Sequence, residues 1–318
     1  MVAKAFNVFI DGEAGTTGLQ ISTRLEGRDD VELLRLADNE RKDLNRRREM
    51  LNDADLVILC LPDDAAREAV SLIDNDTTRV IDASTAHRTA DGWAYGMPEY
   101  KNDQNAIIAA STRVTNPGCY ANASIAILHP LVEQGIVPAD WPVTINAVSG
   151  YSGGGKGLIN AFEDKSSPDF TDEAFRVYGL NLDHKHIPEI QRWSGLSQRP
   201  LFVPSVGRFR QGMIVQVPIQ LGALPGAPSV AAVHDALSSH YAGRQFIRVG
   251  DTTGMVKIDP EMLNDTNELR LHVFGNDEHG QVVIMGVLDN LGKGASGQAV
   301  QNMNLMLGLP EETGLLAG

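Results

Sequence analysis

The run LVILCL at Leu56–Leu61 is apolar at every position, which is typical of a β-strand covered on both faces. Around it, short strand-like runs alternate with helix-like stretches. We expect strands at Ala5–Ile10, Val31–Leu36, Leu56–Leu61, Val80–Asp82 and Ile107–Ala109, and helices through Leu19 and Leu25 and at Ala65–Ile73. Alternation of this kind indicates parallel βαβ units with right-handed connections. The first third of the chain is therefore predicted to form an α/β domain around a doubly wound parallel sheet.

The remainder of the chain follows a different pattern, in which strands succeed one another with few helices between them. We expect strands at Val143–Val148, Leu201–Val206, Met213–Gln220, Phe246–Val249, Leu269–Phe274 and Val282–Leu288, and helices at Cys119–Glu133 and Val230–Tyr241. This order predicts an α+β domain with a mixed sheet. A last helix at 294–307 is expected to pack back on the first domain. The predicted domains are residues 1–118 with 289–318, and residues 119–288.

The composition excludes several classes of protein. A chain of 318 residues is long enough for two domains, and 42% hydrophobic and 21% charged residues are typical of a folded protein. The net charge of −14 argues against nucleic-acid and polybasic membrane binding, which both need concentrated positive charge. No stretch approaches the ~18 apolar residues of a membrane span, and no signal-peptide core is visible. The only cysteines, Cys60 and Cys119, exclude a disulfide framework, so a cytoplasmic protein is expected.

A glycine-rich turn, FIDGEAGTTGLQI, follows the first expected strand and opens the first helix. Gly12, Gly15 and Gly18 allow a tight turn and let backbone N–H groups approach a pyrophosphate at the positive end of the helix. Thr16 and Thr17 could add hydroxyl donors to a phosphate. The spacing G-x-x-G-x-x-G is a variant of the common dinucleotide fingerprint, and an ordinary strand-to-helix turn is the alternative.

Charged residues after the second expected strand bear on the choice of dinucleotide. Asp38 lies about 20 residues after Gly18, where an acidic side chain would bind the 2′-hydroxyl of NAD. Arg41, Lys42 and Arg46–Arg48 could instead accept the 2′-phosphate of NADP, or form a solvated helix face. The residues alone leave NAD and NADP open.

The motif NPGCYA places Cys119 directly after a turn made by Pro117 and Gly118, at the expected start of a helix. The helix dipole and the unpaired N–H groups there favour a thiolate over a thiol. Such a thiolate could attack an activated carbonyl, and the same N–H groups could hold the oxyanion. A buried structural cysteine is the alternative. Cys60, inside the apolar run, is interpreted as a core residue.

The segment HKHIPEI carries two histidines, His184 and His186. A nucleophilic cysteine needs a base or a proton donor, and imidazole suits neutral pH. Two histidines at this spacing could also indicate a metal, but no cysteine or carboxylate lies at a usual ligand spacing, so no metal is expected.

Four motifs taken together resemble the N-acetyl-gamma-glutamyl-phosphate reductases of arginine biosynthesis, in particular their shorter, second type. The motifs are the GEAGTTG turn, NPGCYA, HKHIPEI and the C-terminal DNLGKGASGQAVQNMNLM, and they occur in order over nearly the whole chain. The resemblance implies a Rossmann domain that uses NADP(H). It also implies a second, catalytic domain that shares its architecture with aspartate-semialdehyde and glyceraldehyde-3-phosphate dehydrogenases.

The resemblance assigns roles to residues in the catalytic domain. The family's nucleophile corresponds to Cys119, its two histidines to His184 and His186, and its glutamate to Glu189. His184 is the favoured acid or base and His186 the close second. Lys185 replaces the arginine that is usual between the histidines.

The resemblance also points to residues that hold the substrate. The segment DASTAHR resembles the family's D-x-S-x-x-[FY]-R segment, with His87 where an aromatic residue is usual. Lys156 follows a glycine run that could let the backbone approach a substrate, and a flexible surface loop is the alternative. The expected substrate-binding residues are Ser84, Arg88, Asn116 and Lys156.

The implied chemistry is an acyl transfer followed by a reduction. The Cys119 thiolate attacks the small-molecule acyl phosphate, phosphate leaves, and the thioester accepts hydride from the nicotinamide. Collapse of the hemithioacetal, with a proton from the histidine, releases a semialdehyde. The alternatives are an enzyme like aspartate-semialdehyde or sugar-phosphate dehydrogenases, a cysteine–histidine thiol hydrolase, and a non-catalytic nucleotide sensor. A symmetric homo-oligomer, either a dimer or a tetramer, is expected.

Overall fold

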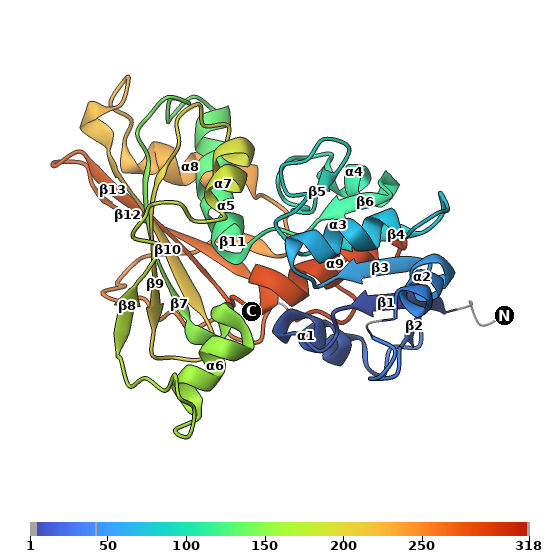
Figure 1. Ribbon diagram of the computed structural model, residues 1–318. Helices are drawn as coiled ribbons and strands as arrows, with labels where there is room; N and C mark the ends of the chain where they lie inside the picture. Colours follow the sequence, from blue (N-terminus) through green and yellow to red (C-terminus); the bar gives the residue numbers. More distant parts are fainter. Residues whose placement is uncertain (1–4, 42, 317–318) are drawn as a thin grey trace. The chain divides into compact units, whose positions relative to one another are not determined.

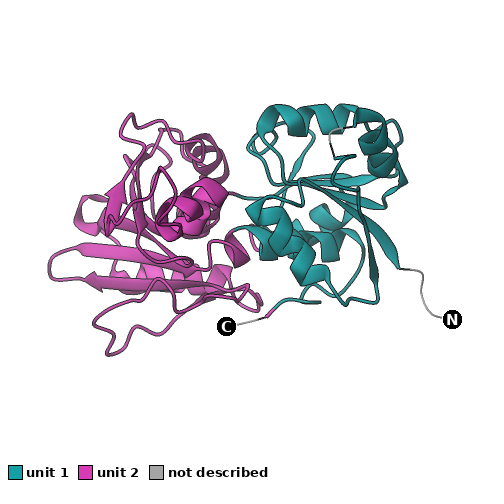
Figure 2. Cartoon of the chain, turned by 60° about the horizontal axis from the view of Figure 1, so that its bottom comes forward, with its two compact units in different colours: residues 1–98, 102–117, 295–315 teal, residues 99–101, 118–294, 316–318 magenta. Residues whose placement is uncertain are grey.

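The computed structural model describes residues 5–41 and 43–316 of the chain. Contacts divide these residues into two units, which Figure 2 colours separately. Unit 1 comprises Met1–Pro98, Asn102–Pro117 and Ala295–Leu315, and unit 2 comprises Glu99–Lys101, Gly118–Gly294 and Leu316–Gly318. The chain thus passes from one unit to the other just ahead of Cys119. Residues 289–294, which the sequence predicts in the first domain, cluster with unit 2.

The sheet of unit 1 contains only parallel strands, in the order β2-β1-β3-β4-β6-β5. The strands are β1 (Phe6–Asp11), β2 (Val31–Leu34), β3 (Leu56–Leu59), β4 (Arg79–Asp82), β5 (Ala94–Tyr95) and β6 (Arg113–Thr115). Every residue of β3 is buried, because helices cover both faces of the sheet (Figure 1). The predicted doubly wound parallel sheet is confirmed.

Two apolar cores lie on opposite faces of this sheet. The helices are α1 (Thr16–Leu25), α2 (Leu44–Asp53), α3 (Asp63–Ser71), α4 (Gln104–Ala110) and α9 (Gly297–Met306). Side chains of α1, α4 and α9 form one core with the strands, and side chains of α2 and α3 form the other. The last helix therefore packs on unit 1, as predicted, although the chain reaches it from unit 2.

The strand expected at Ile107–Ala109 is wrong. These residues lie in α4, and the strand that completes this part of the sheet is β6, at Arg113–Thr115. Alanines around the two isoleucines favour a helix, and only Ile108 of the pair is fully buried, as one face of a helix requires. A short apolar run carries no periodicity that separates the two structures.

The sheet of unit 2 is mixed, in the order β11-β12-β13-β10-β7-β9-β8. The strands are β7 (Thr144–Gly150), β8 (Phe175–Val177), β9 (Leu201–Gly207), β10 (Met213–Gln220), β11 (Ile247–Val249), β12 (Leu269–Asn276) and β13 (Gln281–Leu288). The β7–β9 and β11–β12 pairs are parallel, and the other pairs are antiparallel. This arrangement confirms the α+β prediction.

The helices of unit 2 are α5 (Cys119–Glu133), α6 (Gly155–Glu163), α7 (Ile187–Ser194) and α8 (Val230–His240). Helix α5 contacts β10 and β13 and is flanked by α7 and α8 (Figure 1). It is buried all round from Tyr120 to Leu128, which explains its nearly continuous apolar sequence. Across residues 5–41 and 43–316, no helix is long and apolar enough to cross a membrane.

Candidate active site

Cys119 is the first residue of α5, as the sequence predicted. Gly118 forms the N-cap with φ −74° and ψ 147°, and no side chain caps this end of the helix. The Cys119 side chain is half-buried. A thiolate at this position faces the positive end of the helix dipole and the N–H groups of its first turn. The position therefore suits a nucleophile and an oxyanion formed beside it.

Cys60 lies in a different environment, directly after β3. Its side chain packs against the apolar core of unit 1. Burial is the main cause that raises the pKa of the Cys60 thiol to about 12, and the charges of Asp82 and Asp11 act in the same direction. Cys60 is thus held as a thiol at neutral pH, in agreement with its interpretation as a core residue. Neither cysteine forms a disulfide.

Three contacts within unit 2 hold the turn that carries Cys119. The Gly118 N–H donates to Oε1 of Glu189, 3.0 Å away, and this glutamate is 1% exposed in the first turn of α7. Nδ2 of Asn122 donates to the carbonyl oxygen of Lys293 at 2.8 Å. A Cβ added to Gly294 would lie 2.8 Å from Cβ of Cys119, so only glycine fits there. Glu189 therefore acts on the backbone that precedes Cys119.

The two histidines lie just before α7. His186 is its N-cap residue and is 5% exposed, whereas His184 is half-buried. The His186 main-chain N–H donates to Nδ1 of His184 at 3.1 Å, and the two ring centroids are 4.7 Å apart. The Tyr120 ring, next to Cys119 in sequence, contacts both imidazoles at 5.8 and 5.9 Å between centroids. Unit 2 thus contains all four predicted catalytic residues.

Two tyrosines belong to this cluster that the sequence analysis missed. The Tyr178 hydroxyl lies 3.3 Å from that of Tyr120 and 3.5 Å from Nε2 of His184. Burial is the main cause that raises the pKa of Tyr178 to about 12, and the neighbouring Cys119 charge acts in the same direction. Burial likewise raises the pKa of Tyr120 well above its ordinary value. Tyr120 follows Cys119 directly and could have been considered, whereas no motif marked Tyr178.

The glycine turn of unit 1 needs two of its glycines for steric reasons. Gly12 has φ +93°, and a Cβ there would lie 2.4 Å from the carbonyl oxygen of Cys60. A Cβ on Gly18 would lie 2.5 Å from the carbonyl oxygen of Gly12. Gly15 closes the turn, since its N–H donates to the Gly12 carbonyl at 2.9 Å. The turn brings the backbone close together at the start of α1, as a phosphate site requires.

The hydroxyl of Thr16 also fits a bound phosphate. Thr16 is the first residue of α1, and no side chain caps this helix end. Its Oγ1 atom is buried and has no hydrogen-bond partner among the residues that the structure describes. A phosphate oxygen would satisfy this hydroxyl, together with the free N–H groups of the first turn. Thr17 follows in the same turn and is half-buried. The residues present therefore fit a dinucleotide.

Asp38 lies in a turn after β2, where its side chain is 89% exposed and pairs with Arg41 at 2.8 Å. Arg35, nearer to the end of β2, was missed by the sequence analysis. Its Nε lies 3.1 Å from Oε1 of Glu13 in the glycine turn, and its side chain is 51% exposed. Arg35 therefore places a positive charge beside the glycine turn, through its ion pair with Glu13.

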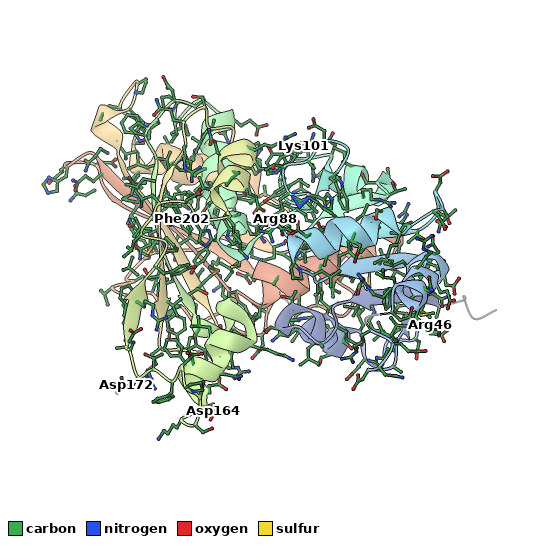
Figure 3. The ribbon with its side chains drawn as sticks, in the orientation of Figure 1. Arg46, Arg88, Lys101, Asp164, Asp172 and Phe202 are labelled. Atoms are coloured by element: carbon green, nitrogen blue, oxygen red, sulfur yellow. The ribbon has the colours of Figure 1, made fainter. Side chains whose placement is uncertain are left out.

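The arginine run on α2 is largely engaged with carboxylates. Arg47 is buried and pairs with Asp11 at 2.8 Å. Arg46, labelled in Figure 3, pairs with Glu40 and Glu49. Lys42 of the same basic set lies outside the described residues. Arg46 and Arg47, two of the arginines expected to bind a 2′-phosphate, are thus engaged in ion pairs with carboxylates of the protein.

Three of the expected substrate-binding residues lie together in unit 1. Ser84 Oγ donates to Oδ2 of Asp82 at 2.8 Å. Arg88 (Figure 3) donates from Nε to the Asn116 carbonyl at 3.1 Å and from Nη2 to the Ala83 carbonyl at 2.9 Å. Nδ2 of Asn116 donates to the Ala295 carbonyl at 3.0 Å. These contacts fix the backbone at the carboxyl end of the parallel sheet, where α/β folds bind ligands.

The fourth expected substrate residue, Lys156, lies in unit 2. It is exposed in the first turn of α6, which follows a 3₁₀ turn at Tyr151–Gly154. The hydroxyl of Ser152 in that turn accepts a hydrogen bond from Nδ2 of Asn290 at 3.0 Å. The loop before Lys156 is therefore anchored. No group of three or more potential metal ligands occurs in residues 5–41 and 43–316.

Two family models match the chain. The model described as "Semialdehyde dehydrogenase, NAD binding domain" matches residues 7–108. The model described as "Semialdehyde dehydrogenase, dimerisation domain" matches residues 119–290. Together they span most of both units.

Curated relatives resemble the chain over nearly its whole length. It is 54% identical to N-acetyl-gamma-glutamyl-phosphate reductase 2 of Pseudomonas putida, with coverage of 95% of this chain and 96% of the relative. It is 50% identical to the Nostoc sp. protein of the same name, with coverage of 97% and 98%. It is 52% identical to the N-acetyl-gamma-glutamyl-phosphate reductase of Brucella ovis, with coverage of 95% and 98%.

Solved structures share the fold at low sequence identity. Aspartate semialdehyde dehydrogenase II from Vibrio cholerae has a TM-score of 0.68 at 14% identity, with coverage of 96% of this chain and 99% of that chain. Aspartate semialdehyde dehydrogenase with NADP from Candida albicans has a TM-score of 0.66 at 13% identity, with the same coverage. At these identities the likeness concerns the arrangement of helices and strands.

Proposed function

The chain belongs to the N-acetyl-gamma-glutamyl-phosphate reductases of the semialdehyde dehydrogenase family, and we propose that it reduces N-acetyl-γ-glutamyl phosphate through a thioester on Cys119. The observation that carries the covalent step is the position of Cys119 at the uncapped N-terminus of α5. Glu189 supports it, because its carboxylate holds the N–H of Gly118 at the entrance of that helix. An activated acyl group is the substrate that such a thiolate can attack.

The proposed reaction begins when the Cys119 thiolate attacks the acyl carbon and the bond to phosphate breaks. N–H groups in the first turn of α5 stabilise the oxyanion. A bound reduced nicotinamide would supply hydride to the thioester, and the carbon on Cys119 would then become that of a hemithioacetal. One imidazole, of His184 or His186, protonates the resulting oxygen and takes the proton back as the carbon–sulfur bond breaks. The semialdehyde leaves and the thiolate is restored.

The chain contains an NAD(P)-binding domain, and we propose NADP(H) as its cofactor. Gly12, Gly15, Gly18, Thr16 and Thr17 would hold the pyrophosphate. Two cationic side chains after β2, those of Arg35 and Arg41, would face the 2′-phosphate. Arg41 also pairs with Asp38 in the same segment. We also propose a homo-oligomer, since residues 119–290 match a model described as a dimerisation domain.

The proposed substrate is tested by assays in the oxidative direction with N-acetylglutamate semialdehyde, aspartate semialdehyde, phosphate and either NADP⁺ or NAD⁺. We expect the highest kcat/KM with the N-acetylated semialdehyde and NADP⁺. A strong preference for aspartate semialdehyde would overturn the substrate assignment. The same preparation, analysed by sedimentation, gives the oligomeric state.

A further inference from the structure

A chain of hydrogen bonds runs from the main chain at the N-cap of α7 to the main chain of β9 through three side chains. It starts at the His186 N–H, which donates to Nδ1 of His184 at 3.1 Å. It continues from His184 to Tyr178 and from Tyr178 to Tyr120, and it ends at the Ser205 carbonyl, which accepts from the Tyr120 hydroxyl at 3.1 Å. All of these residues belong to unit 2.

The two ends of this chain fix its direction. A carbonyl oxygen can only accept, so the single proton of the Tyr120 hydroxyl is used at Ser205. The Tyr178 hydroxyl must then donate to Tyr120, and it is left to accept from His184. At the other end, a main-chain N–H can only donate, so Nδ1 of His184 carries no proton. Both constraints place the ring proton of His184 on Nε2.

We infer that Tyr178 and the His186 amide hold His184 as a neutral imidazole protonated at Nε2, and that His184 serves the reaction as a hydrogen-bond donor. The inference deepens the proposed function and takes its substrate from it. Tyr178 is then a positioning residue, whose hydroxyl oxygen accepts a hydrogen bond from the Nε2–H group until a substrate oxygen takes its place. The 3.5 Å distance between the Tyr178 oxygen and Nε2 of His184 is long for a hydrogen bond. Replacing this acceptor by a substrate oxygen therefore costs little free energy.

Formation of an imidazolium at His184 would conflict with this arrangement. A second proton on Nδ1 would point at the His186 N–H, with the two nitrogens only 3.1 Å apart. The ring also packs against aromatic side chains, with the Phe202 centroid at 5.1 Å and the Tyr120 centroid at 5.8 Å (Figure 3 labels Phe202). Proton exchange then falls to His186, in contrast to the sequence-based preference for His184.

The state of the tyrosines agrees with the direction of the chain. Burial is the main cause that raises the pKa of Tyr178 to about 12, and it raises the pKa of Tyr120 as well. A thiolate at Cys119 raises both further. Both hydroxyls therefore keep their protons at neutral pH, as a chain of donors requires.

The first test reads the tautomer directly, without any substrate. Nitrogen-15 NMR of the histidine side chains in the wild-type protein should show His184 neutral, with the proton on Nε2. In Tyr178→Phe the Nε2 proton should exchange faster with water. A matched control is Tyr241→Phe, because that buried hydroxyl donates to the Ala126 carbonyl at 2.8 Å. Finding the His184 proton on Nδ1 in the wild type would overturn the inference.

The second test compares two substitutions of His184. Glutamine can present an N–H near the position of Nε2, whereas the shorter asparagine reaches only the position of Nδ1. If His184 acts as a hydrogen-bond donor, His184→Gln should keep kcat within ~10-fold of wild type. His184→Asn should then lower kcat by ~10²–10³-fold, as does the loss of an oxyanion donor. If His184 is instead the general acid or base, kcat should fall by a similar, large factor in both variants, and that result would overturn the inference.

The third test links Tyr178 to His184. Tyr178→Phe should lower kcat/KM by ~2–3-fold, the low end for one neutral hydrogen bond because this bond is long, and should add nothing in the His184→Asn background. Full additivity of the two losses, or an unchanged Tyr178→Phe enzyme, would count against a positioning role. An inactive wild type with the Nε2 tautomer present would refute the proposed substrate and leave the histidine geometry standing.

Discussion

The Lys293 ammonium lies 2.8 Å from the Glu99 carboxylate, and the two side chains are 0% and 2% exposed. Both residues belong to unit 2, although Glu99 precedes Cys119 in sequence and Lys293 lies close to the end of the chain. The carbonyl of Lys293 accepts from Asn122 on α5, and the next residue, Gly294, packs against Cys119. This buried ion pair therefore anchors the segment that packs against Cys119, the proposed nucleophile.

We predict that Glu99→Gln lowers the free energy of unfolding by about 3–5 kcal/mol, because it leaves the Lys293 charge buried without its counter-charge. Urea unfolding at neutral pH measures the change. Glu173→Gln is the matched control, since its ion pair with Arg176 is 39–49% exposed and should contribute about 0–1 kcal/mol. Equal effects of the two substitutions would contradict the role given to burial.

Replacement of the nucleophile should separate binding from chemistry. We expect Cys119→Ser to lose nearly all turnover while it still binds NADP(H), because the oxygen of serine is a far weaker nucleophile at neutral pH. Turnover and calorimetric titration of the dinucleotide provide the two readouts. Cys60→Ser is the comparison for a thiol with a raised pKa, and it should stay active. Wild-type rates in Cys119→Ser would end the covalent scheme.

The glycine turn predicts a steric effect on cofactor binding. A methyl group at Gly18 would meet the carbonyl oxygen of Gly12 at 2.5 Å, so Gly18→Ala should deform the turn and raise the Kd for NADP(H) at least ~10-fold. Fluorescence titration of the reduced dinucleotide measures this. Gly222→Ala serves as the control, because nothing lies within 4 Å of its added methyl. An unchanged Kd in Gly18→Ala would argue against this turn as the phosphate site.

The largely buried side chain of His129 on α5 should make the free energy of unfolding depend on pH. Burial is the main cause that lowers the pKa of His129 to about 4, and the Tyr100 ring stacks on it at 4.0 Å. The unfolded chain binds this proton near pH 6.5, so the contribution of His129 is complete above that pH and is lost as the pH falls toward 4. The loss amounts to roughly 3 kcal/mol.

Urea unfolding at pH 8 and pH 5 provides the measurement. We expect His129→Gln to reduce the difference in unfolding free energy between the two pH values. The neighbouring His240 adds to the same trend, since burial lowers its pKa too. His234→Gln is the control, because that side chain is 47% exposed on α8. A pH dependence that is identical in wild type and His129→Gln would exclude His129 as its source.

Local sequence patterns were sufficient for much of the fold. Continuous apolar runs predicted the buried strands, and the helix expected at Cys119–Glu133 has those bounds in the structure. The error at Ile107–Ala109 arose because a short apolar run fits a helix and a strand equally well. These residues form a helix because Ile108 packs in the core of unit 1, which the local sequence does not reveal.

By itself, the sequence determined the two fold classes, the glycine turn and the place of Cys119 at a helix start, because each depends on residues close together in the chain. Only the tertiary structure decided which groups surround them. Glu99 meets Lys293, and Tyr178 meets Tyr120, across long sequence separations that no local pattern encodes. The tautomer of His184 likewise follows from a carbonyl on β9 and an amide at α7, because hydrogen-bond direction is a property of the assembled network.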